Sequence, residues 1–131
     1  MHMCSVWDDS KVEIDRHKWI QSQKAGCDLG EQATREWIRK HWCGYLRARW
    51  LEHLQGRTYW IELDRGDYGL LNRDFQDKPG LLEQIIDRLI AGQENLDVIQ
   101  WALDTKLPTD DIREILTKLD INSRRLAHDF E

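Results

Sequence analysis

Apolar residues recur at three- and four-residue intervals along most of the chain, which is the spacing of one face of an α-helix. The clearest run lies between Pro79 and Gly92 and carries Leu81, Leu82, Ile85, Ile86, Leu89 and Ile90. A second run carries Leu96, Ile99, Ala102 and Leu103, and a third, beginning near Thr109, carries Ile112, Ile115, Leu116 and Leu119. Short connections join these runs, so the pattern predicts an all-α, multi-helix bundle.

The segment Glu31–Gln55 predicts one long, tryptophan-rich helix whose apolar residues point in nearly every direction. A helix of this kind is usually central, with neighbours on more than one side. Its apolar side changes along its length, from Ala33, Trp37, Ile38 and Tyr45 to Trp42, Leu46, Trp50 and Leu54. Gly44 lies at the crossover. The pattern therefore fits either a kink at Gly44 or one straight helix packed against two layers.

The remaining segments complete a single domain over residues 1–131. Residues 1–9 show no periodicity and predict a loose N-terminal end. Ser10 is a suitable N-cap for a first helix that ends near Gly26 and carries Val12, Ile14, Trp19 and Ile20. Residues 57–63 combine β-branched and aromatic side chains, so they are the one strand-like stretch, although they could also be extended or helical.

Composition narrows the class of protein. The 131 residues are 40% hydrophobic and 33% charged, enough for a core with a well-solvated surface, and the net charge of −5 disfavours nonspecific nucleic-acid binding by the whole molecule. Three cysteines form no framework of pairs, which is typical of reduced thiols. With neither a signal peptide nor an apolar run long enough to span a membrane, the sequence predicts a cytoplasmic protein with no membrane partner.

The C-terminal residues suggest a DNA-binding hypothesis. Ile115, Leu119, Ile121 and Leu126 have the apolar spacing of a bacterial helix-turn-helix, and this stretch of about 20 residues resembles that family. A short last helix beginning near Asn122 or Ser123, with Leu126 and Phe130 facing inward, would offer Ser123, Arg124 and Arg125 to DNA. Leu116 and Asp120 depart from the family pattern, where a small residue and a glycine are usual. A plain helical hairpin explains the same spacing.

The long helix provides a second candidate surface, because basic and aromatic residues alternate along it: Arg35, Arg39, Lys40, Arg47 and Arg49 among Trp37, Trp42, Tyr45 and Trp50. Such a mixture can hold single-stranded nucleic acid by stacking. Tryptophan on a central helix is more often part of the core, with arginine covering its edge. Surplus tryptophan and arginine are also the residues that anchor protein interfaces.

No pattern of residues supports a catalytic, cofactor or metal assignment. The acidic turn of Glu62, Asp64 and Asp67 lacks the spacing of a calcium loop. We therefore interpret it as a solvated turn. His17, His41 and His53 lie outside any zinc-protease or catalytic-triad context. A third functional hypothesis is an enzyme whose site combines carboxylates and a histidine from different segments. Such a site requires a concave pocket that holds several polar groups.

A segment near the N-terminus resembles a family of uncharacterised bacterial proteins. It reads His-Lys-Trp at residues 17–19, then Ser22, Ala25-Gly26, Asp28 and Gly30, followed by Ala33 and Trp37. The resemblance covers about 25 residues. It implies a bacterial origin and transfers no activity or functional residue.

From these patterns we expect a small interaction or adaptor module that binds another protein or a second copy of itself. Its expected anchors are the exposed members of a tryptophan set, with two arginines at the rim: Trp7, Trp42, Trp50 and Trp60, with Arg47 and Arg49. The alternative is a nucleic-acid-binding protein that uses Ser123, Arg124 and Arg125 or the basic side of the long helix.

Overall fold

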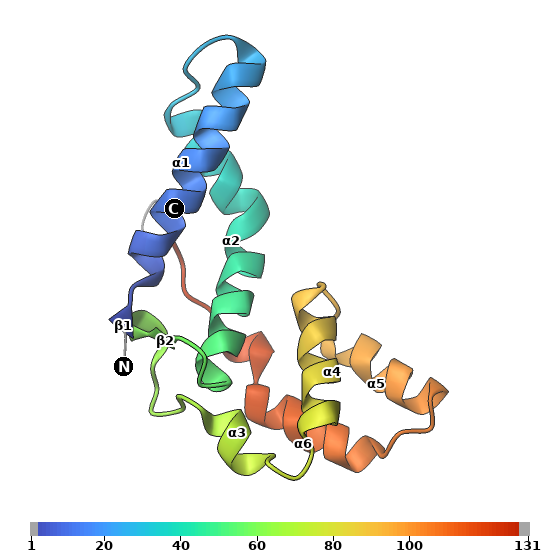
Figure 1. The fold of residues 1–131 in the computed structure, drawn as a ribbon. Coiled ribbons are helices and arrows are strands. Elements are labelled where there is room, and N and C mark those ends of the chain that lie inside the picture. Colours follow the sequence, from blue (N-terminus) through green and yellow to red (C-terminus); the bar gives the residue numbers. More distant parts are fainter. Residues whose placement is uncertain (1–2, 129–131) are drawn as a thin grey trace.

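The protein is all-α, with six α-helices and one very small sheet among the residues described. The computed structural model describes residues 3–128, without the side chain of Ser123. Figure 1 shows two long helices forming a hairpin that rises from a body of shorter helices. Within residues 3–128, none of the helices has the length and apolar character needed to cross a membrane.

Helix α1 (Val6–Ala25) begins earlier than the sequence pattern predicts. Ser5 is its N-cap, and the Ser5 hydroxyl accepts hydrogen bonds from the backbone N–H groups of Trp7 and Asp8. Ser10, the predicted cap, is buried inside the helix and donates to the Trp7 carbonyl. Residues 3–9 are therefore a strand and a helical turn, and the expectation of a loose end there is corrected. The helix ends at Gly26 in a left-handed conformation, as predicted.

Helix α2 (Glu31–Leu54) matches the predicted central helix to within one residue and continues through Gly44. Its upper half packs along α1, and its lower half reaches the body formed by the later helices (Figure 1). The change of apolar side along the sequence therefore reflects two sets of neighbours. It does not interrupt the helix.

The strand-like segment contains only a two-residue strand, β2 (Tyr59–Trp60), which pairs in parallel with β1 (Met3–Cys4). Met3 lies opposite Tyr59 and Cys4 opposite Trp60. The next residues form a 3₁₀ turn, Ile61–Leu63. A strand this short needs a partner and a support, and it has both, since Trp60 is buried against α2.

The C-terminal half contains α3 (Leu70–Asp74), α4 (Pro79–Ile90), α5 (Asn95–Asp104) and α6 (Thr109–Leu119). The predicted faces of α4 and α6 supply core residues, including Ile85, Leu89, Ile115 and Leu119. Helix α5 differs, because it buries Val98 and Ala102 while Leu96 and Leu103 are exposed. The predicted apolar face of this helix is therefore only partly correct, because packing against α4 and α6 buries Val98 in place of Leu96 and Leu103.

Candidate functional site

The C-terminal segment is not a helix-turn-helix. After α6, Asp120 takes a left-handed conformation, Ile121–Ser123 forms a single 3₁₀ turn, and residues 124–128 are not helical. A second helix that could enter a DNA groove is therefore missing from residues 121–128, and this prediction was wrong. The Ser123 side chain and Phe130 lie outside the part of the chain that is described.

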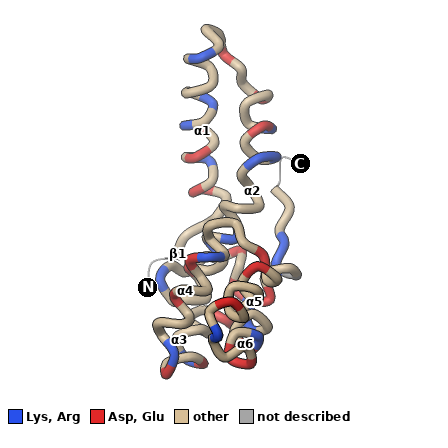
Figure 2. Tube along the Cα trace, turned by 90° about the vertical axis from the view of Figure 1, so that its right-hand side faces the viewer, with Lys and Arg blue, Asp and Glu red and all other residues tan. Residues whose placement is uncertain are grey.

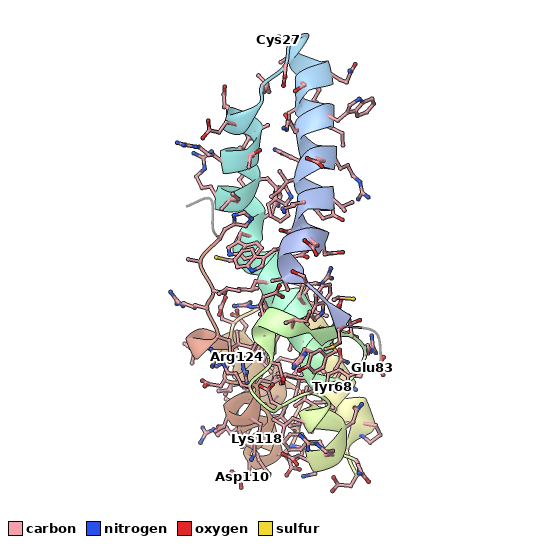
Figure 3. The ribbon with its side chains drawn as sticks, turned by 90° about the vertical axis from the view of Figure 1, so that its left-hand side faces the viewer. Cys27, Tyr68, Glu83, Asp110, Lys118 and Arg124 are labelled. Atoms are coloured by element: carbon pink, nitrogen blue, oxygen red, sulfur yellow. The ribbon has the colours of Figure 1, made fainter. Side chains whose placement is uncertain are left out.

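Arg124, one of the three predicted DNA contacts, points into the molecule. Its Nη1 lies 2.9 Å from Oδ2 of Asp67, and its Nε donates to the Leu119 carbonyl. The guanidinium also lies over the ring of Trp50, 4.1 Å from the ring centroid. Burial lowers the pKa of Arg124, which the nearby Asp67 carboxylate partly offsets. Figure 3 shows Arg124 where the C-terminal segment crosses the body. Arg124 therefore fastens this segment to the fold.

Behind Asp67 lies a buried histidine whose partners are far apart in the sequence. His53, at the end of α2, accepts a hydrogen bond at Nδ1 from the Trp60 backbone N–H, at 3.1 Å. Its Nε2 lies 3.4 Å from Oδ1 of both Asp64 and Asp67, longer than a well-formed hydrogen bond. The structure thus joins the histidine and two of the acidic-turn residues that the sequence analysis treated separately.

These three side chains could be taken for a metal site, since their candidate ligand atoms lie within 4.8 Å of one another. The tautomer argues against it. Because Nδ1 of His53 accepts the Trp60 N–H, the ring proton is on Nε2, the atom that a metal would have to bind. Metal-binding histidines usually donate through the other ring nitrogen. The arrangement fits an Nε2–H group of His53 directed at the Asp64 and Asp67 carboxylates better than it fits a metal cation.

The His53 cluster holds a turn in place. The Tyr59 hydroxyl donates to Asp64, and this bond, with the Gly66 N–H, lowers the pKa of Asp64. The Gly69 N–H donates to the His53 carbonyl at 3.0 Å. Gly56 has a positive φ of 75° and packs closely against Gly69. A Cβ at residue 56 would lie 3.3 Å from the Cα of Gly69. With its imidazole fully buried, His53 is unavailable to a substrate, and its role is structural.

Most of the predicted site residues meet along one groove of about 400 Å³ between α2 and residues 121–127. Two of the predicted tryptophans form its floor, and the arginines lie around it: Trp42, Trp50, Arg47, Arg124 and Arg125. Arg47 pairs with Glu94 at 3.1 Å. Trp60 and Arg49 lie outside the groove, where Arg49 pairs with Glu52 at 2.7 Å.

The predicted anchors are core residues. Trp42, Trp50 and Trp60 have exposed fractions of 2%, 4% and 4%, and Trp7 stacks on Trp42. The indole of Trp42 donates to the Leu126 carbonyl at 2.7 Å, so this ring binds the C-terminal segment of its own chain. The interpretation of tryptophan on the central helix as core is confirmed, and Trp42, Trp50 and Trp60 are too buried to act as anchors.

In the upper half of α2 the exposed basic residues lie apart from the buried aromatic ring. Arg35 and Lys40 are exposed near the upper end of the hairpin and pair with Glu31 and Glu36 on the same helix. Trp37, by contrast, is buried. Further down the helix the basic and aromatic residues do meet, since the Arg49 guanidinium lies over the Tyr45 ring, 5.0 Å from its centroid. Trp37, Trp42 and Trp50 are buried, so bases could not stack on these rings. Figure 2 shows blue and red segments following each other on both long helices.

The outer side of α1 exposes a different tryptophan. Trp19 is 65% exposed, and Val12 and Ile20 on the same helix are 57% and 37% exposed. Ile14, which the sequence analysis grouped with them, is buried against α2. The signal was present in the spacing, since Val12 and Trp19 are seven residues apart and share a side, whereas Ile14 lies opposite. We call the exposed set of Val12, Trp19 and Ile20 the Trp19 face.

Comparison with known proteins adds no relative. The chain matches no family model, no curated protein and no solved structure. The resemblance to uncharacterised bacterial proteins stays a prediction.

Proposed function

We propose that this protein is a protein-interaction module whose docking surface is the Trp19 face of α1. The observation that carries the proposal is the exposure of Trp19, on a chain whose other aromatic-rich segment is packed into a core. An exposed tryptophan leaves a large apolar surface in water, and burying it against a partner is favourable. Tryptophan is also enriched among the residues that dominate binding energy at protein interfaces.

The position of the face supports the same function. It lies on a long hairpin that stands away from the body, so a partner can reach it without rearranging the core (Figures 1 and 3). Glu13, Asp15, Arg16 and Lys18 lie around the apolar residues, which gives an apolar centre with a charged rim. We place this module in the cytoplasm, because Cys4, Cys27 and Cys43 are all free thiols and reducing compartments preserve such thiols.

The test compares tagged wild-type protein with Trp19→Ala, each recovered from its host with and without nuclease treatment. We expect a stoichiometric partner protein with the wild type and its loss with Trp19→Ala. The matched control is Leu96→Ala, which removes a side chain that is 79% exposed on α5 and should leave the partner in place. Both variants should unfold within about 0.5 kcal/mol of the wild type, because they change exposed positions.

Two results would refute the proposal. One is a partner that Trp19→Ala retains in full, which would place the interface elsewhere. The other is co-purifying material that disappears with nuclease, which would indicate a nucleic-acid-binding protein. Because Arg124 is held by Asp67 and Trp50, Arg125 would then be the first residue to replace.

A further inference from the structure

The groove between α2 and residues 121–127 shares no residue with the Trp19 face, and its lining indicates a second binding site. We infer that it binds a small apolar anion, an organic acid whose apolar body lies in the groove and whose carboxylate pairs with Arg125. We call this site the Arg125 groove. Its support is the size of the groove, its apolar lining and the sign of its charges, none of which depends on Trp19.

The Arg125 groove has the size and the lining of a small-molecule site. Its volume of about 400 Å³ falls in the range of about 300 to 1,000 Å³ that is usual for such sites. Trp42, Leu46 and Trp50 of α2 close its bottom, and Leu126 and Ala127 of the C-terminal segment form the opposite wall. A ligand body between these walls exchanges water for apolar contacts, and the gain grows with the apolar area that it covers.

The wall formed by the C-terminal segment is held at two points. At the lower point the Arg124 guanidinium pairs with Asp67, and further up the Trp42 indole donates to the Leu126 carbonyl at 2.7 Å. Arg125 lies in the chain between these two points. Figure 1 shows the segment rising beside α2 toward the hairpin. The groove is therefore preformed, and a ligand does not have to order this segment before it binds.

The charges of the groove have one sign. The charged side chains that line it, among the residues described, are all arginines: Arg47, Arg124 and Arg125. Arg47 and Arg124 already pair with acidic residues outside the groove. Arg125 is exposed, and its Nε donates to the Asn122 carbonyl at 3.3 Å. Within residues 3–128 it has no acidic partner, so both of its Nη groups remain for a ligand.

A carboxylate is the group that fits this guanidinium. The planar fork of an arginine donates two parallel hydrogen bonds to the two oxygens of a carboxylate. An amine would instead meet three guanidinium groups of its own sign. An inorganic anion would pair with Arg125 but would leave the apolar walls uncovered. A molecule with an apolar body and one carboxylate matches both parts of the groove.

The first experiment is calorimetry on the full chain with naphthoate and with naphthamide, which has the same ring system and no charge. We expect naphthoate to bind with a Kd of about 100 μM, which is ordinary for its size, and naphthamide to bind at least about tenfold more weakly. Arg125→Gln should weaken naphthoate binding about tenfold and leave naphthamide binding unchanged. The matched control is Arg39→Gln, which changes an exposed arginine of α2 outside the groove and should bind both compounds like the wild type.

Two exposed cysteines show where the compound binds. Cys43 lines the groove, and Cys27 lies at the far tip of the hairpin (Figure 3). With naphthoate at about 1 mM, alkylation of Cys43 by iodoacetamide should slow at least about fivefold, because a Kd of about 100 μM leaves only about one site in ten empty. Alkylation of Cys27 should keep its rate. Mass spectrometry of the peptides that carry the two cysteines measures both rates in one sample.

Four results would overturn the inference. Two are the absence of naphthoate binding at about 1 mM and equal affinities for naphthoate and naphthamide. A third is binding that Arg125→Gln leaves unchanged. The fourth is protection of Cys27 in place of Cys43, which would put the compound in the hollow that Cys27 shares with Trp19. None of these results decides whether a partner protein is captured through the Trp19 face, which the Trp19→Ala comparison tests separately.

Discussion

The two ends of α2 lie in very different surroundings. Near the body, Leu51, His53 and Leu54 are fully buried, and the helix contacts β2, α3 and α4. Near the tip of the hairpin, α2 has α1 as its main neighbour, and the last residue of α1 that is buried is Ile14. One end of the helix is enclosed by the fold and the other has a single helical layer beside it.

The same residue type has opposite roles in these two regions. Trp50 packs between α2 and the C-terminal segment, with the guanidinium of Arg124 over its ring. Trp19 extends from the hairpin into solvent. Counting tryptophans could not separate the two cases, because the number of neighbouring elements decides whether a large ring is core or surface. The lower region provides stability, and the upper region provides an exposed surface.

The largest expected effect comes from a cavity in the lower region. Leu51→Ala removes a fully buried side chain of α2, so we expect the free energy of unfolding to fall by about 3 kcal/mol. Val12→Ala, on the exposed side of the hairpin, should change it by less than about 0.5 kcal/mol. Urea titration of both variants measures the difference. Similar losses in the two variants would mean that the outer side of α1 is as enclosed as the core.

A smaller effect tests how the C-terminal segment is fastened. Arg124→Ala removes the pair with Asp67 and the contact with Trp50, and should cost about 2 kcal/mol. The neighbouring Arg125→Ala is the matched control and should cost less than about 0.5 kcal/mol. A double-mutant cycle with Asp67→Asn should show a coupling of about 1 kcal/mol. Equal losses for the two arginines would contradict the different positions assigned to them.

The smallest expected effect is a pH dependence at the turn below α2. The pKa of Asp64 is lowered in the folded state, chiefly by the Tyr59 hydroxyl. A lowered pKa stabilises the fold above the unfolded-state pKa of about 4, and this stabilisation is lost as pH falls through the folded-state value. Tyr59→Phe should move the pKa of Asp64 upward and flatten the loss of stability below about pH 4. NMR titration of the Asp64 carboxyl carbon measures the shift, and an unchanged pKa in Tyr59→Phe would exclude this hydrogen bond as its main cause.

Several features could be predicted from local sequence. The glycine stop at Gly26, the limits of the central helix and the apolar face of α4 depend on residues close together in the chain. Other features depend on distant pairs. The start of α1 combines both kinds, since Ser5 caps it through bonds to the nearby Trp7 and Asp8 N–H groups while its hydroxyl donates to Glu62, far along the chain. The position of Arg124 likewise depends on a distant residue, because its guanidinium pairs with Asp67, which lies in an earlier turn.

The sequence by itself determined that the protein is helical, with one long central helix and a set of shorter ones, because apolar spacing and end signals act within a few residues. Only the tertiary structure decided which tryptophans are core and which is exposed, and which arginine is held inward. It also placed His53 between two acidic side chains of a turn. The physical reason is that burial and ion pairing depend on which segments become neighbours in space, and helical periodicity contains no information on that pairing.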